Sequence, residues 1–251
     1  MEDIGRVEIF ADPTSLAAHA AEWMILAALA TEGPCRVSLS GGATPKALYS
    51  LLASERFRDR FPWQRVHWYW GDERFVPYDH PESNYRMTRE AMLSKVPVPP
   101  ENVHPIPTDG DPDEAAQRYE RALQEVYGGT SFDRAHPLFD VTLLGLGADG
   151  HTASLLPDEP VLDERSRWVA AVSHGRPEVR VTMTYPTIES SRRVAFLVAG
   201  REKAGIFDAI RGGNSRVPAA QVRPVGELIW FVDRFAAGEQ KMPRRAGSRS
   251  S

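Results

Sequence analysis

Several features that would suggest particular protein classes are missing from this sequence. Its single cysteine, Cys35, excludes an intramolecular disulfide and a cysteine-based zinc site. No histidine or carboxylate cluster has the spacing of a zinc site either, so we expect no metal and no cofactor. The longest apolar stretch, near residues 23–30, is too short to span a bilayer. The acidic start Met1-Glu-Asp is followed by no signal-peptide core, and we expect a cytoplasmic protein with no membrane partner.

A strong charge imbalance is also missing. The chain has 30 Lys and Arg against 34 Asp and Glu, a formal net charge of -4, which argues against nucleic acid as a partner. A small anionic substrate remains compatible with this balance, because a few local basic side chains suffice to bind it. With 251 residues, of which 42% are hydrophobic, the chain has the length and composition of a globular enzyme with a substantial core.

Strand-like and helix-like segments alternate along the chain. This alternation predicts an α/β fold of three layers (α/β/α) with a mostly parallel, Rossmann-like sheet in a single domain, residues 1–237. The basic, Arg/Ser-rich tail, 238–251, is expected to be disordered. The predicted strands are 7–10, 35–39, 66–70, 141–144, 168–172, 181–184, 194–198 and 228–232, and the predicted helices are 13–30, 45–53, 84–95, 111–127 and 201–210.

The most informative segment follows the predicted strand 141–144. Three glycines within six residues break the strand, and Asp149 and His151 follow at its end. Ligands of open α/β sheets bind beyond the carboxyl ends of the strands, where glycines allow close approach of the backbone. A carboxylate and an imidazole on such a turn can move protons together. The alternative is a simple connecting loop in which His151 makes only a local hydrogen bond.

A second glycine turn, Ser40-Gly-Gly-Ala-Thr-Pro45, lies between a predicted strand and a predicted helix. We predict Thr44 as the N-cap and Pro45 as the first helical residue. A helix start of this kind binds phosphate through its free N–H groups. It matches neither a nucleotide P-loop nor a Gly-x-Ser-x-Gly nucleophile elbow. The alternative is a tight turn with a capping threonine.

Charged residues accompany other element ends. Asp72, Glu73 and Arg74 follow the strand 66–70, where they form either a surface ion pair or part of a ligand site. Arg180 precedes a strand and Lys203 lies at a helix start. Each of these two is either a solvated charge or a countercharge for a phosphate bound near residues 40–44.

Taken together, these segments resemble the 6-phosphogluconolactonases of the sugar-phosphate isomerase-like α/β superfamily. The resemblance extends over about residues 6–237, and the order and spacing of the shared motifs make it specific. The motifs are Ser-Gly-Gly-x-Thr-Pro at 40–45, Gly-Asp-Glu-Arg at 71–74, Gly-Leu-Gly-x-Asp-Gly-His-Thr-Ala-Ser at 145–154, Arg-Val-Thr-Met-Thr-Tyr-Pro at 180–186, Gly-Arg-Glu-Lys-Ala at 200–204 and Gly-Glu-Leu-x-Trp-Phe-x-Asp at 226–233.

The resemblance implies hydrolysis of 6-phosphoglucono-1,5-lactone, a small phosphosugar lactone. We expect the protein to be a monomer or weak homodimer. His151 would be the general base, Asp149 would hold the polar network, and Arg74 would stabilise the oxyanion. Asp72 would face the sugar. The resemblance assigns the 6-phosphate to Ser40, Gly41, Gly42, Thr44, Arg180 and Lys203.

Two rival functions stay open. One is a glucosamine-6-phosphate deaminase or isomerase, which by resemblance supports the same histidine with a glutamate five residues later, where this chain has Leu156. The other is a non-catalytic sugar-phosphate-binding protein, against which the presence of His151 and Arg74 argues.

Overall fold

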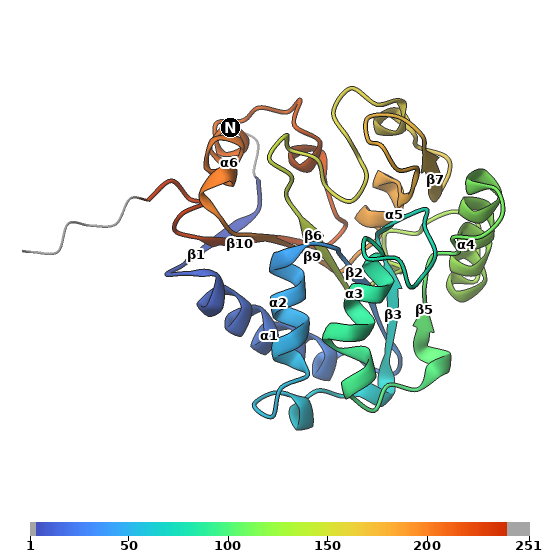
Figure 1. Ribbon diagram of the computed structural model, residues 1–251, viewed down its shortest axis with the longest axis horizontal. Helices are drawn as coiled ribbons and strands as arrows, with labels where there is room; N and C mark the ends of the chain where they lie inside the picture. Colours follow the sequence, from blue (N-terminus) through green and yellow to red (C-terminus); the bar gives the residue numbers. More distant parts are fainter. Residues whose placement is uncertain (1–3, 240–251) are drawn as a thin grey trace, which may run out of the picture.

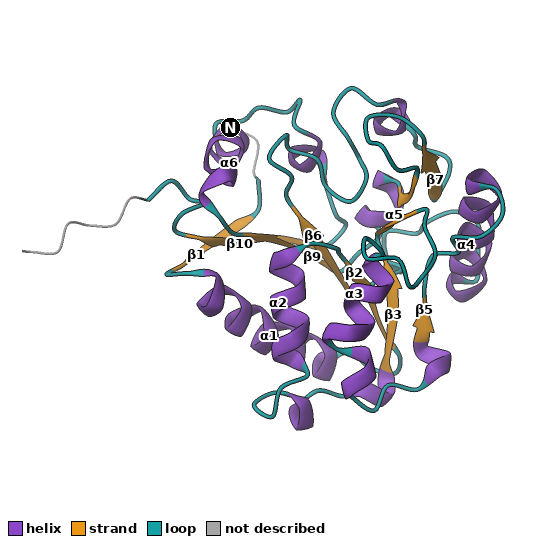
Figure 2. Cartoon of the chain, in the orientation of Figure 1, coloured by secondary structure: helices purple, strands orange, loops and turns teal. Residues whose placement is uncertain are grey.

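The computed structural model describes residues 4–239 and contains two β-sheets (Figures 1 and 2). The larger sheet has seven strands, all paired in parallel, in the order β1-β10-β9-β6-β2-β3-β5. The prediction of a mostly parallel sheet between helices is thereby confirmed. Its strands are β1 Arg6–Phe10, β2 Cys35–Leu39, β3 Val66–Trp70, β5 Val103–His104, β6 Val141–Gly145, β9 Arg193–Val198 and β10 Glu227–Asp233.

The strand order reverses between β2 and β6. From β2 the chain proceeds outward through β3 and β5, and from β6 it proceeds the other way through β9 and β10. A crevice opens beyond the carboxyl ends of the strands at such a switch point, and open α/β sheets bind their ligands there. Both glycine turns, at 40–45 and 145–151, follow these two strands, so the topology brings them to the same crevice.

A small antiparallel sheet in the order β4-β8-β7 is the main feature that the sequence analysis did not predict. The strands β7 Val169–Val172 and β8 Arg180–Met183 were expected, but they pair with each other and with β4 Asp72–Arg74 rather than with the main sheet. The two sheets meet at Gly71, whose N–H donates to the carbonyl of Leu39 and whose carbonyl accepts from the N–H of Met183.

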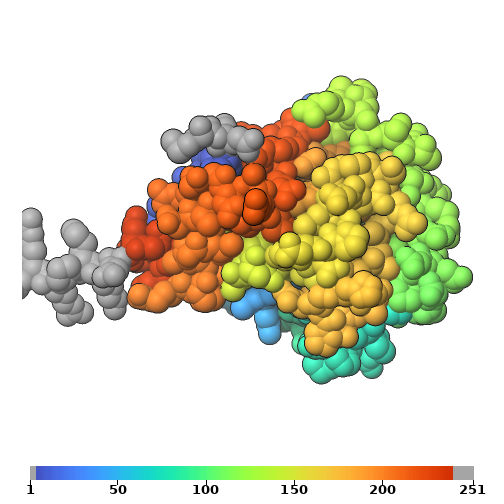
Figure 3. All heavy atoms as spheres, turned by 90° about the horizontal axis from the view of Figure 1, so that it is seen from above, coloured from blue at the N-terminus to red at the C-terminus, as the bar shows by residue number. Residues whose placement is uncertain are grey.

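The helices cover both faces of the larger sheet. In Figure 1, α1, α2 and α3 lie together below it, while α6, α5 and the small sheet lie above. Seen from above, the yellow surface of the chain between β6 and β8 separates the orange surface around α6 from the green surface of α4 (Figure 3). The helices are α1 Pro13–Ala30, α2 Ala43–Leu52, α3 Asn84–Ala91, α4 Pro112–Tyr127, α5 Tyr185–Glu189 and α6 Ala204–Arg211, and the short 3-10 helix η6 is Arg201–Lys203.

The start of α1 at Pro13 is as predicted, and α4 begins at Pro112, one residue after the predicted start. Asp12 caps α1 by accepting the N–H of Ser15, and Asp111 caps α4 by accepting the N–H groups of Asp113 and Glu114. For α2 the predicted cap at Thr44 is incorrect, because the helix begins at Ala43 and its N-cap is Gly42. Gly42 has φ 105°, a left-handed conformation that glycine adopts without strain, and it lets the chain turn into the helix earlier than Thr44 would.

Three further differences concern irregular or terminal segments. The proline-rich stretch 96–107, expected to be a loop, contains the edge strand β5, which is too short to show a strand pattern in the sequence. The predicted helix 84–95 ends at Ala91 and continues as a 3-10 turn, Leu93–Lys95. Of the tail, only residues 238 and 239 belong to the described part, and 240–251 lie outside it. Within the described residues, no helix is long and apolar enough to cross a membrane.

Candidate active site

A cavity of about 320 Å³ lies at the switch point of the main sheet and collects most of the predicted site residues. Its lining includes both glycine turns, part of the small sheet and the loop after β9. Nine of the ten predicted residues line it, and the tenth, Asp149, stands directly behind His151. The nine are Ser40, Gly41, Gly42, Thr44, Asp72, Arg74, His151, Arg180 and Lys203.

The start of α2 forms one wall of the cavity. No side chain caps this helix, so the N–H groups of Ala43 and Thr44 are not taken up by a cap. Uncapped N–H groups and the positive end of the helix dipole make a site for an anion. The missing side-chain cap suits the expected chemistry, since no side chain competes with a ligand for the donors at the start of α2.

The turn after β6 brings Asp149 and His151 into direct contact. Asp149 Oδ1 lies 2.5 Å from His151 Nδ1 and 3.2 Å from the backbone nitrogen of His151. Burial acts to raise the pKa of Asp149, but hydrogen bonds from His151 and Arg176 outweigh it and lower this pKa to about 2. Ionised Asp149 accepts a hydrogen bond from Nδ1–H of His151. Nε2 of the neutral ring is then free to accept a proton.

Gly147 is required for this contact. A Cβ atom at position 147 would lie 2.0 Å from His151 Nδ1 and 2.6 Å from Asp149 Oδ1. Any side chain there would displace the ring or the carboxylate. The glycine spacing of the turn thus reflects the space that the Asp149–His151 pair occupies.

Positive charge dominates the opposite wall. Arg74 and Arg180 are register partners on β4 and β8, and the Nε atom of each is buried without a hydrogen-bond partner. Burial and the neighbouring Arg74 lower the pKa of Arg180, although Glu178 lies 3.8 Å from its guanidinium. Among residues 4–239, no ion pair involves Lys203. Such a set of cations suits an anionic ligand.

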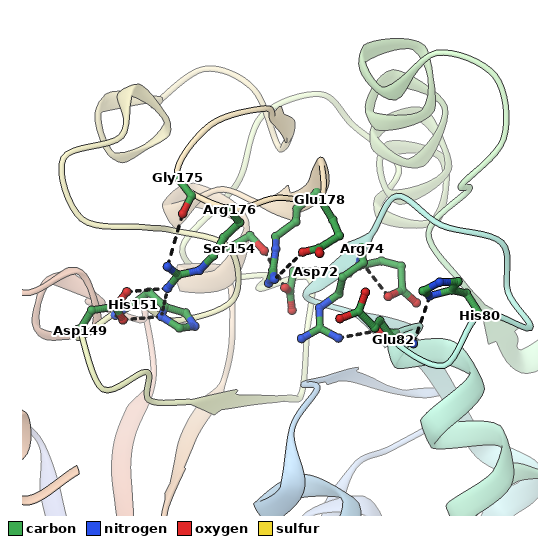
Figure 4. Close-up of polar contacts among 12 residues, drawn as sticks. Asp72, Arg74, His80, Glu82, Asp149, His151, Ser154, Gly175, Arg176 and Glu178 are labelled. Carbon is green, nitrogen blue, oxygen red and sulfur yellow. Dashed lines mark hydrogen bonds and ion pairs between the residues drawn. The ribbon is translucent and has the colours of Figure 1, made fainter. Parts of the chain in front are cut away.

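Asp72 links the small sheet to the segment that follows β6. The hydroxyl of Ser154 donates to Asp72 Oδ2 at 2.7 Å (Figure 4). The side-chain amide of Asn84 donates to the Asp72 carbonyl at 2.9 Å. Asn84 also lines the cavity and lies against Gly41. Asn84 was predicted only as the first residue of a helix, 84–95, and not as a site residue. Its position, fixed by side chains distant in sequence, could not be read from one motif.

Glu73 anchors the start of α3 and does not line the cavity, although the sequence left open that it forms part of a ligand site. Its buried carboxylate accepts the backbone N–H groups of Arg74, Asn84 and Tyr85 at 2.7–2.8 Å and the hydroxyl of Ser83 at 3.0 Å. Burial raises the pKa of Glu73 in spite of these donors. The start of α3 is therefore clamped to β4.

We expect Glu73→Gln to lower the free energy of unfolding by about 2–3 kcal/mol. The amide has one acceptor oxygen in place of two and turns an NH₂ group toward buried donors. Urea denaturation measures the change, with the exposed Glu55→Gln as a control that should stay within about 0.5 kcal/mol of wild type. Equal stability of the two variants would contradict a clamping role for Glu73.

The fold and the cavity together define a Rossmann-like α/β protein with an uncapped helix start, basic side chains and an Asp–His pair at its switch point. The chain matches the family model of glucosamine-6-phosphate isomerases/6-phosphogluconolactonase over residues 11–230. The 6-phosphogluconolactonase of Synechocystis is 44% identical over 224 residues, which cover 87% of this chain and 90% of that protein. The chain belongs to this family.

Solved structures agree with this membership. The 6-phosphogluconolactonase from Trypanosoma cruzi superposes with a TM-score of 0.80 at 29% identity, covering 95% of this chain and 97% of the other. A monomeric glucosamine-6-phosphate deaminase gives a TM-score of 0.78 at 21% identity, covering 94% of this chain and 100% of the other. The second similarity shows only that the fold is shared.

Proposed function

We propose that the protein hydrolyses 6-phospho-D-glucono-1,5-lactone to 6-phospho-D-gluconate, as a 6-phosphogluconolactonase of the oxidative pentose phosphate pathway. The observation that carries the proposal is the cavity, in which a carboxylate-held histidine faces the same space as an uncapped helix start and three basic side chains. Curated relatives of this name, at 44% and 38% identity over most of the chain, support the same reaction.

The reaction needs one base and one site for negative charge. His151 Nε2 takes a proton from water as the oxygen attacks C1 of the lactone, and Arg74 stabilises the resulting oxyanion. The C1–O5 bond then breaks, and the imidazolium returns its proton to O5. The new carboxylic acid ionises into solvent. No covalent intermediate is required, because the lactone is already an activated ester.

The substrate's phosphate binds at the other end of the cavity. In this proposal the N–H groups around Ser40, Gly41, Gly42 and Thr44 hold it together with Arg180 and Lys203, and Asp72 faces the sugar hydroxyls. A pH-stat assay with freshly generated lactone tests the activity, because hydrolysis releases one proton. A rate no faster than spontaneous hydrolysis would contradict the proposal.

We also expect no deaminase or isomerase activity on glucosamine 6-phosphate. Those reactions require ring opening and proton movement between C1 and C2, for which an acid supporting the histidine is expected at position 156. Leu156 is a buried core residue there, and the side chain that contacts Asp149 and His151 from outside the turn is the cation Arg176. An ammonia-release assay checks this, and turnover comparable to the lactonase rate would move the chain to the deaminase branch.

The remaining expectations concern location and assembly. A cytoplasmic enzyme is supported by Cys35, a free buried thiol whose pKa burial raises to about 12, which makes it unreactive. A monomer or weak homodimer is tested by light scattering across a concentration series.

A further inference from the structure

The loop between β7 and β8, residues 173–179, brings a cation to the back of the Asp149–His151 pair. Arg176 Nη2 lies 2.5 Å from Asp149 Oδ2 and 3.3 Å from His151 Nδ1. Figure 4 shows the guanidinium reaching toward the pair from the side of Gly175, whose carbonyl accepts its Nη1 at 3.3 Å. Arg176 does not line the cavity, in contrast to Arg74 and Arg180. It therefore touches the base's partner and not the substrate.

Each oxygen of Asp149 has its own partner as a result. Oδ1 faces His151, and Oδ2 faces Arg176. The Asp149 side chain is 39% exposed, so without Arg176 its carboxylate would be held from one side only and could rotate into solvent. A carboxylate fixed at both oxygens keeps the imidazole in one orientation and one tautomer.

The contact of Arg176 with the ring leaves the Nδ1 proton to Asp149. Arg176 Nη2 lies 3.3 Å from His151 Nδ1, but a guanidinium has only donors, so a hydrogen bond from Nδ1–H goes to Asp149 Oδ1 alone. Nε2 makes no hydrogen bond within residues 4–239 and stays available to take a proton from water.

We propose that Arg176 is a positioning residue that fixes the Asp149 carboxylate and keeps His151 in the neutral tautomer with a free Nε2. The role of the tautomer in catalysis rests on the proposed lactonase function, whereas the effect of Arg176 on the ring does not. Besides Asp149 and Arg176, the charged groups that share the cavity with His151 are Asp72 and Arg74 on β4, Arg180 on β8, and Glu202 and Lys203 on η6.

The test compares Arg176→Ala, Arg176→Lys and the exposed control Arg121→Ala on α4. We expect Arg176→Ala to lower kcat about tenfold, which is a part of the roughly 10²–10⁴-fold that a positioned base contributes. Its KM should stay within about twofold of the wild-type KM. Arg176→Lys, which retains the charge, should recover most of the loss in kcat, and Arg121→Ala should match wild type.

A readout independent of activity separates this proposal from the proposed function. Long-range ¹H–¹⁵N spectra report the tautomer of the His151 ring, assigned by comparison with His151→Ala. In Arg176→Ala we expect exchange between the two tautomers, whereas wild type and Arg121→Ala should show one. If wild type does not hydrolyse the lactone, these spectra alone decide the role of Arg176. An unchanged tautomer in Arg176→Ala, or a loss of activity confined to KM, would overturn the proposal.

Discussion

Replacing His151 with alanine is expected to lower kcat for the lactone by roughly 10²–10⁴-fold, the contribution of a positioned general base. His151 is the histidine that lines the cavity, and its Nδ1 is bound to an ionised carboxylate, so its Nε2 is the proton acceptor available to an attacking water. The variant should fold normally, because the ring is partly exposed and packs against a glycine turn rather than the core.

Two measurements make this result specific. Calorimetry with 6-phosphogluconate should give nearly the same affinity for wild type and His151→Ala, because the proposed phosphate site lies elsewhere in the cavity. The control His136→Ala removes an exposed histidine that also pairs with an aspartate, and it should retain full activity. Activity of His151→Ala within about threefold of wild type would refute the assignment of the base.

Substitutions at the phosphate end should change binding rather than chemistry. We expect Arg180→Ala and Lys203→Ala each to weaken 6-phosphogluconate by about 10–100-fold, since each removes a charge-assisted contact of roughly 1.5–3 kcal/mol. The affinity for unphosphorylated gluconate should change far less. Isothermal titration of both ligands measures the difference.

The exposed Arg211→Ala on α6 is a suitable control, because it removes a cation close to Lys203 in sequence but outside the cavity. It should bind both ligands as wild type does. Equal losses for the phosphorylated and the unphosphorylated ligand in Arg180→Ala or Lys203→Ala would show that these side chains do not contact the phosphate.

The central strands and the composition of the cavity could be predicted from sequence for a common physical reason. Buried parallel strands appear as short apolar runs, and residues that follow such runs gather at one edge of the sheet. Ser40, Asp149 and His151 each follow an apolar run closely, so their meeting depends only on the strand order. Local sequence carries that information.

The missing parts depend on contacts between distant segments. The strand β4 consists of Asp72, Glu73 and Arg74, which have no apolar pattern, and only pairing with β8 makes it a strand. The roles of Glu73 and Arg176 arise from partners 11 and 27 residues away. A charged residue in a loop looks the same in a sequence whether it is solvated or ion-paired.

The division of the cavity between two sheets has a consequence for how such enzymes diversify. The helix start that holds an anion belongs to the main sheet, whereas Arg74, Arg180 and the loop bearing Arg176 belong to the small one. Exchanging only the loop 173–179 between β7 and β8 would therefore alter the surroundings of His151 while α2 and Arg180, both assigned to the phosphate, stay in place. A change of reaction on phosphorylated sugars would then require neither a new fold nor a new phosphate site.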